Sequence, residues 1–170
     1  MQQEQNATVI GESIFVTGSL SGDENLTVLG RVEGSISLSQ TLFVAESSFT
    51  RGIARELRAY PIREDGSLGT FTTLFTWGED AKGVHRGIDG MCLDRDGNIV
   101  ATAGWEEAGS GPMIYVFSPA GRVLETHPLP ADRPTNCCFG GPDLTTLFVT
   151  TGAGHFFKAQ TNRVGWAIYP

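Results

Sequence analysis

Short apolar runs rich in β-branched and aromatic residues alternate with turns of Asp, Asn, Gly and Pro over most of this chain. From about residue 36 this pattern repeats three times. Each copy contains a strand-like run, at 42–45 in the first, 99–102 in the second and 147–150 in the third. A shorter apolar run precedes that strand in each copy, and two more runs follow it. A unit of about 45 residues with four strands is typical of one blade of a β-propeller.

The second copy shows its four expected strands most clearly, at 91–93, 99–102, 113–117 and 123–127. The other two copies align with it strand by strand. The expected strands of the first copy are 36–38, 42–45, 56–60 and 71–75. Those of the third copy are 137–139, 147–150, 155–159 and 164–168. We therefore predict an all-β chain with three four-stranded antiparallel sheets and no helix longer than about two turns. An all-β sandwich is the alternative, but its strands need not recur in groups of four.

The first 38 residues are built differently, from very short strands closed by Gly at intervals of about six to eight residues. Such spacing is typical of the rungs of a β-solenoid, whose corners need Gly or small polar residues. So few rungs cannot offset the entropy of ordering them. We predict that residues 1–38 do not fold independently, that 26–38 supply or extend the inner strand of the first blade, and that 39–170 form a partial, three-blade propeller.

The balance of charge limits the partners. The chain has 170 residues, 18% of them charged, and a net charge of −7, whereas binding to nucleic acid needs a clustered basic face. No apolar stretch is long enough to span a bilayer, and the polar start does not look like a signal peptide. We expect no nucleic-acid partner, no membrane partner and a cytoplasmic location.

Three cysteines, Cys92, Cys137 and Cys138, fall on predicted inner strands without CxxC spacing or a nearby pair of histidines. An odd number with two adjacent is a poor disulfide framework. We interpret them as reduced, small core residues rather than as a zinc site.

Several motifs from residue 39 onward resemble the gluconolactonase, regucalcin and senescence marker protein family in order and spacing. They lie at 41–47, 88–94, 96–99, 114–119 and 134–143. The resemblance covers about three quarters of the chain but only about half of the family's six-bladed propeller. It implies a metal-dependent hydrolase that opens a sugar-acid lactone with the help of a divalent cation, calcium or zinc.

The segment from about 7 to 38 resembles a second family, most closely over 18–36. It is similar to the bactofilins, bacterial cytoskeletal β-helix proteins that polymerise end to end. The likeness covers about the first fifth of the chain.

Asp89 is the residue on which the lactonase resemblance mostly depends. It precedes the inner strand of the second blade, where the family's matching Asp is similar in role to a metal ligand and general base. A cation can polarise the lactone carbonyl while a carboxylate removes the proton of the attacking water. The alternative is that Asp89-Gly90 is only the turn before a strand.

Further candidates flank this position. Asn136 starts the inner strand of the third blade and either contacts substrate or caps a turn. The family's acidic ligand from its first blade has no counterpart in this chain. The family's Asn ligand aligns with Glu33 or Gly34, so that Glu33 is a candidate metal ligand. His85, Arg86 and Trp105 are candidate substrate-binding residues at the channel mouth, with exposed loop residues as the alternative for the first two.

Three hypotheses follow. The chain is a lactonase-family enzyme for a small-molecule lactone when a second copy, as a homodimer, or a partner completes the ring. Alternatively it is a polymerising scaffold led by the bactofilin-like segment, or an inactive truncated or recombined product. Length favours the first, because two rungs bury little apolar surface.

Overall fold

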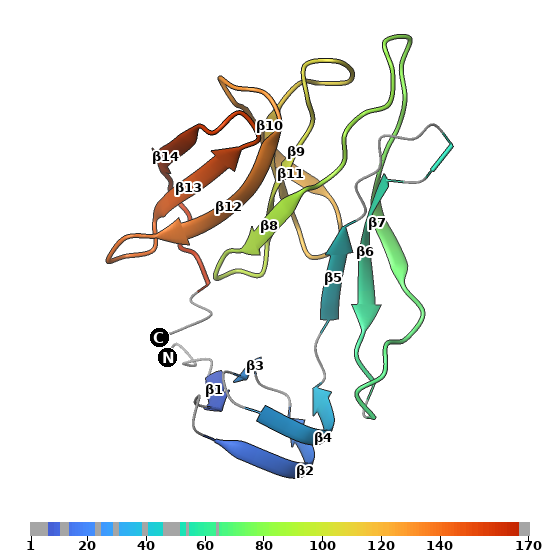
Figure 1. Cartoon of the computed structure of the whole chain (residues 1–170), viewed down its shortest axis with the longest axis vertical. Helices are drawn as coiled ribbons and strands as arrows, with labels where there is room; N and C mark the ends of the chain where they lie inside the picture. The colour runs from blue at the N-terminus through green and yellow to red at the C-terminus, as the bar shows by residue number, and fades with distance from the viewer. Residues whose placement is uncertain are drawn as a thin grey trace. The chain divides into compact units, whose positions relative to one another are not determined.

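The computed structural model describes residues 7–10, 14–22, 25–28, 31–38, 41–45, 52–53, 55–63 and 65–166. These residues form strands β1 to β14, joined by turns and loops (Figure 1), and contain no helix. The prediction of an all-β chain is therefore confirmed. The described part has no helical segment of the length and apolar character needed to cross a membrane.

The N-terminal strands pair in parallel, which is how successive turns of a solenoid stack. β1 (Ala7–Ile10) pairs with β3 (Asn25–Val28), and β2 (Phe15–Gly22) pairs with β4 (Arg31–Leu38). The register between β2 and β4 places like residues opposite one another, for example Val16 and Val32, Gly18 and Gly34, Ser19 and Ser35. The solenoid-like character expected of this segment is thus present in its pairing.

The prediction that 26–38 extend the first blade is wrong. The first blade's sheet has three strands among the described residues, in the order β5 (Thr41–Ala45), β6 (Arg55–Pro61) and β7 (Thr72–Trp77). The run 36–38, expected as its inner strand, belongs to β4 instead. Because β2 offers β4 a parallel partner along all eight of its residues, the local repeat decides the pairing.

The second blade has the four antiparallel strands that the sequence predicts. They follow one another in the sheet as β8 (Gly90–Leu93), β9 (Ile99–Ala103), β10 (Met113–Phe117) and β11 (Val123–Pro128). The third sheet contains β12 (Pro134–Gly140), β13 (Thr146–Thr151) and β14 (Phe156–Gln160).

The predicted fourth strand of the third blade, 164–168, does not join β14 over its described part. Gly165 instead makes an antiparallel bridge with Asp94, at the end of β8. Trp166 N donates to Leu93 O at 3.0 Å, and Arg95 N donates to Val164 O at 2.7 Å. The prediction is wrong here because the open edge of β8 has backbone groups that need partners, and this stretch supplies them.

The chain divides into two compact units. One comprises Met1–Val44, Ala59–Thr72 and Ile168–Pro170, and the other comprises Ala45–Arg58 and Thr73–Ala167. The second unit contains the complete second and third sheets, so the candidate site residues after position 72 all lie in it.

Two apolar layers hold the second unit together. One lies between the second and third sheets and consists of Val100, Ile114, Val116, Cys137, Leu147 and Val149. The other is aromatic and joins β7 to β10, where Phe75 and Trp77 contact Tyr115 and Phe117. The ring centroids of Phe75 and Phe117 are 5.2 Å apart, within the range of favourable aromatic pairs. β10 thus contributes to both layers, one from each of its faces.

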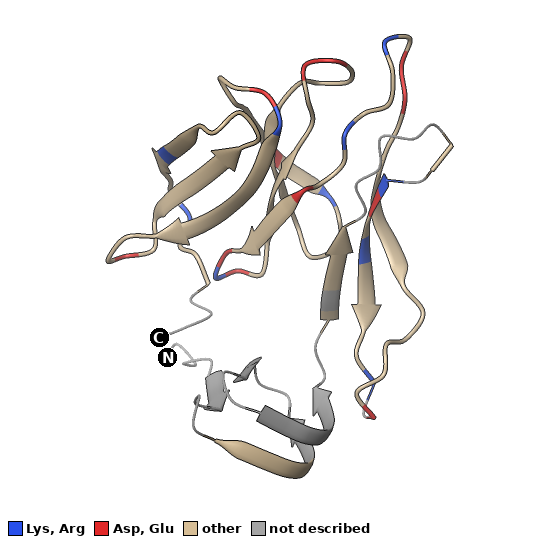
Figure 2. Ribbon diagram, in the orientation of Figure 1, with Lys and Arg blue, Asp and Glu red and all other residues tan. Residues whose placement is uncertain are grey.

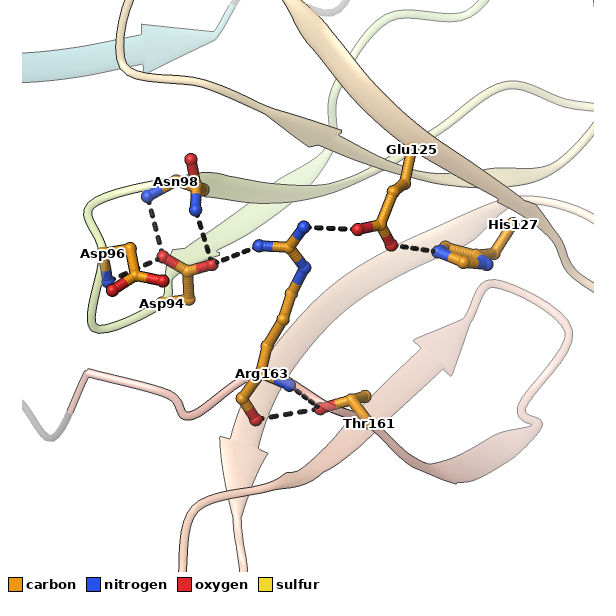
Figure 3. A network of polar contacts seen from close by, with 7 residues as sticks. All are labelled: Asp94, Asp96, Asn98, Glu125, His127, Thr161 and Arg163. Atoms are coloured by element: carbon orange, nitrogen blue, oxygen red, sulfur yellow. Dashed lines mark hydrogen bonds and ion pairs between the residues drawn. The ribbon is translucent and has the colours of Figure 1, made fainter.

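A polar network on Asp94 ties the end of the chain to the second blade (Figure 3). Asp94 Oδ1 accepts the backbone N–H of Asp96 and of Asn98, while its Oδ2 accepts Asn98 Nδ2 at 2.9 Å and Arg163 Nη1 at 2.7 Å. Only 2% of the Asp94 side chain is exposed. Arg163 also pairs with Glu125 on β11. A buried carboxylate is tolerated here because both of its oxygens are fully used.

Removing the Asp94 carboxylate should destabilise the fold. Asp94→Ala leaves two turn N–H groups and Arg163 without their acceptor, so we expect the free energy of unfolding in urea to fall by about 3 kcal/mol. Asp96→Ala is the matched control, because its exposed side chain lies in the same turn and should change stability by less than about 0.5 kcal/mol. Equal effects of the two substitutions would contradict this account.

The same network predicts a dependence of stability on pH. Hydrogen bonds from Arg163 and then His127 lower the pKa of Glu125 from its ordinary 4.5. A carboxyl whose pKa is lower in the folded state stabilises the fold above its unfolded pKa and loses that contribution as pH falls through the folded value. The stability difference between the wild type and Glu125→Gln should therefore shrink when unfolding is measured at pH 3 rather than pH 6. A difference independent of pH would exclude this role for Glu125.

Candidate functional site

Asp89 presents an exposed carboxylate at the start of β8. Its backbone N–H donates to Thr102 O on β9 at 3.0 Å, which fixes the main chain at the point where the strand begins. Its side chain is 38% exposed, and Oδ2 lies 2.5 Å from Nη2 of Arg86. This placement leaves the Asp89 carboxylate partly open to solvent, and its role as metal ligand and general base stays a prediction.

Arg86 is buried and uses its guanidinium within the protein. Only 4% of its side chain is exposed. Besides Asp89, it donates from Nη1 to Pro134 O at 2.7 Å and to Gly104 O at 3.3 Å. Arg86 therefore joins the loop before β8 to the residue after β9 and to the start of β12, and it holds the Asp89 carboxylate in one orientation.

Asn136 lies beside Gly90, across the boundary between the second and third blades. A Cβ atom built on Gly90 would come within 2.4 Å of Asn136 Oδ1, 2.6 Å of Thr135 O and 2.7 Å of Asn136 Cα. Asn136 is itself exposed, and its Oδ1 accepts the N–H of Cys137 at 2.8 Å. The sequence predicts Asp89 and Asn136 as site residues from separate copies of the repeat. The structure brings Asn136 against Gly90, the residue that follows Asp89.

His85 and Trp105 hold the loops around this point. Trp105 Nε1 donates to Val84 O at 3.0 Å, and His85 Nε2 lies 3.2 Å from Asp80 Oδ2. Both side chains are half-buried. Their role in binding substrate stays a prediction, and the contacts show that each also fixes a loop.

Asp80 was not among the sequence candidates, although it connects the same loops. It accepts backbone N–H groups from Lys82, Gly83 and Gly109, and these bonds lower its pKa to about 2. The short spacing from Asp80 to Lys82 and Gly83 is a signal for such a turn. The bond to Gly109 has no sequence signal.

Among the residues that the structure describes, no three His, Cys, Asp or Glu side chains gather as a metal cluster. Asp89 supplies one carboxylate, already paired with Arg86. The amide oxygen of Asn136, which lies against Gly90, already accepts the N–H of Cys137. Glu33 lies in β4 opposite Thr17, and its side chain is outside the described residues. A calcium ion takes about six to eight oxygen ligands, so the described donors do not by themselves fit a metal site.

Figure 2 shows where the charges of the described residues lie. Acidic side chains occur mainly in the loops and turns, and Lys and Arg are dispersed over strands and loops rather than gathered on one element. This distribution accords with the net charge of −7.

Comparison with known proteins decides the family. The model for the SMP-30/gluconolactonase/LRE-like region matches residues 39–153. The chain belongs to this family. The match includes Asp89, Arg86 and Asn136 and ends within the third sheet.

Curated relatives match over part of their length. Regucalcin from Danio rerio is 34% identical over 89 residues, which are 52% of this chain and 27% of the relative. A 6-deoxy-6-sulfogluconolactonase from Pseudomonas putida is 37% identical over 95 residues, 56% of this chain and 30% of that protein. The chain therefore spans about a third or less of the lactonase-family relatives it matches.

The N-terminal resemblance is also found. Bactofilin BacP from Myxococcus xanthus is 54% identical over 44 residues, which are 26% of this chain and 18% of BacP.

Solved structures show the fold. A luciferin-regenerating enzyme aligns with a TM-score of 0.58 at 22% identity, covering 75% of this chain and 43% of the enzyme. A calcium-binding protein, regucalcin from Agrobacterium tumefaciens, aligns with a TM-score of 0.51 at 21% identity, covering 65% and 40%. The prediction of a partial propeller is confirmed.

The approach of β8 to β12 predicts that Gly90 tolerates no side chain. Gly90→Ala places a Cβ atom against backbone atoms of Thr135 and Asn136, so the strands must separate, and we expect a loss of about 1–3 kcal/mol in unfolding free energy. Gly78→Ala is the matched control, since a Cβ there meets nothing within 4 Å. Thermal unfolding of both variants measures the difference. An unchanged melting temperature for Gly90→Ala would show that the two strands are not packed as described.

Proposed function

We propose that this chain is one half of a lactonase-type propeller and that it hydrolyses a sugar-acid lactone once the ring is completed. The observation that carries the proposal is the exposed Asp89 carboxylate, oriented by buried Arg86, with Asn136 packed against the adjacent Gly90. The family match and the likeness to a sulfogluconolactonase support the substrate class.

In the proposed reaction, Asp89 acts as the general base. Water attacks the carbonyl carbon of the lactone while the Asp89 carboxylate takes one of its protons. The ring C–O bond then breaks, Asp89 returns that proton to the departing ring oxygen, and a hydroxy acid is released. Oδ1 of Asn136 accepts the Cys137 N–H, which leaves Nδ2 to donate a hydrogen bond to a substrate oxygen. Arg86 positions the carboxylate, because it is buried and its Nη1 already binds Pro134 O and Gly104 O.

Asp89 is also the proposed ligand that this chain supplies to a divalent cation, either calcium or zinc. Since the described donors are too few to form a site for that cation, the other ligands would have to come from the copy or partner that completes the ring. The neighbouring structure named as a calcium-binding regucalcin supports calcium as the first ion to test.

A second copy of the chain is the proposed partner. Three consecutive sheets in each chain give six in a dimer. The outward side of the third sheet carries Phe156, which is 67% exposed and stacks on Phe148 with ring centroids 5.6 Å apart. An exposed aromatic ring on an edge strand favours burial against another sheet.

Asp89→Asn should abolish the hydrolysis of glucono-1,5-lactone. Loss of a general base costs about a hundredfold or more in rate, while the exposed position of Asp89 predicts an unchanged fold by circular dichroism. Asp96→Asn is the control, because it alters an exposed carboxylate at the opposite end of β8. Equal activity of Asp89→Asn and the wild type would assign the catalysis elsewhere.

Sedimentation over a range of protein concentrations, run beside the assay, distinguishes the hypotheses. Activity per chain that rises with the dimer population supports ring completion, whereas an inactive monomer supports a truncated product.

The parallel stacking of β2 on β4 and the match to BacP favour a second candidate function, a polymerising scaffold. Filaments without lactonase activity would support that function.

A further inference from the structure

Cys92 and Cys137 face one another between the second and third blades. Their Sγ atoms are 3.9 Å apart, although 45 residues separate them in the sequence. Cys92 lies on β8 and Cys137 on β12, so the pair joins two sheets that share no strand. Cys137 belongs to the apolar layer between those sheets, and Cys92 packs against it.

Several contacts hold the two sulfur atoms in place. Cys137 Sγ donates to Val100 O at 3.4 Å, and its backbone N–H is bound by Asn136 Oδ1. Two residues before Cys92, Gly90 allows the backbone of β12 to come close to β8. The sulfur pair is therefore set by the closest approach of the two strands.

The two thiols differ in access and acidity. Cys137 is 5% exposed, whereas Cys92 is half-buried. The hydrogen bond between the thiols lowers the pKa of Cys92 and raises that of Cys137, to which burial adds. The thiolate, which is the reactive form, therefore develops first on Cys92.

We propose that Cys92 and Cys137 are an oxidisable pair that forms a disulfide between the second and third blades when the chain meets a peroxide. A disulfide needs sulfur atoms about 2 Å apart, with Cβ atoms about 4 Å apart. The sulfur atoms, 3.9 Å apart, must therefore approach by about 2 Å for the bond to form.

The reaction balances with hydrogen peroxide as the oxidant. The Cys92 thiolate attacks one peroxide oxygen, the O–O bond breaks, and the departing hydroxide takes a proton to become water. The Cys137 thiol then attacks the sulfur of the resulting sulfenic acid and displaces a second water. Two thiols and one peroxide give one disulfide and two waters.

Cys138 is not part of this pair. It follows Cys137 in β12, so its side chain points to the opposite face of the sheet, where it is exposed. The bond would join Cys92 and Cys137 across a sequence separation of 45, and a cross-link over so long a loop restricts the unfolded chain. Oxidation should therefore raise the melting temperature.

The test uses the full chain, reduced and freed of reductant, and then treated with hydrogen peroxide. Thiols counted in denaturant should fall from three to one, intact mass should drop by two hydrogens, and thermal unfolding should shift upward by several degrees. Peptide mapping without reduction should join the fragments that contain Cys92 and Cys137. Reduction should reverse all four changes.

Cys138→Ser removes the exposed thiol and leaves the pair intact. After treatment with hydrogen peroxide, the thiol count of this variant should fall from two to zero and its mass should drop by the same two hydrogens. Cys92→Ser should keep two thiols and gain no intramolecular bond. The proposal is overturned if Cys138→Ser gains oxygen without losing two hydrogens, or if the mapped bond joins Cys138 of two chains. It does not rest on the lactonase function, since no outcome depends on turnover.

Discussion

The close approach of β8 to β12 is the constraint on which the second unit depends. Gly90 has no side chain, and the backbone of Thr135 and Asn136 occupies the space that one would fill. This contact brings Asn136 next to the residue that follows Asp89, and it sets the distance between Cys92 and Cys137. The apolar layer of Val100, Val149 and their neighbours then fills the wedge between the two sheets.

Arg86 fixes the position of the Asp89 carboxylate within this packing. It is a buried cation, and burial of a charge is unfavourable unless the charge is paired and hydrogen-bonded. Asp89 supplies the opposite charge, and the carbonyls of Gly104 and Pro134 supply two acceptors. The exposed Asp89 carboxylate is consequently held in place by a buried residue.

The strands of the second blade could be predicted closely from the sequence, because each is a run of β-branched or aromatic residues bounded by Asp, Asn or Gly. Partners of strands were harder to predict, since an apolar run does not specify its neighbour. Residues 36–38 pair with β2, and Gly165 pairs with Asp94, because those partners offer matching backbone edges. Asp89 could be found through a family motif, whereas the burial of Arg86 depends on carbonyls up to 48 residues away.

The crowding at Gly90 also limits how this protein can change over evolution. A tight contact between two side chains can usually be relieved by shrinking either one. Here two of the three nearest atoms, Thr135 O and Asn136 Cα, belong to the main chain, so no substitution at position 135 or 136 can compensate for a larger residue at position 90. The side chains at positions 135 and 136 can therefore vary, whereas position 90 must remain glycine as long as the strands keep this arrangement.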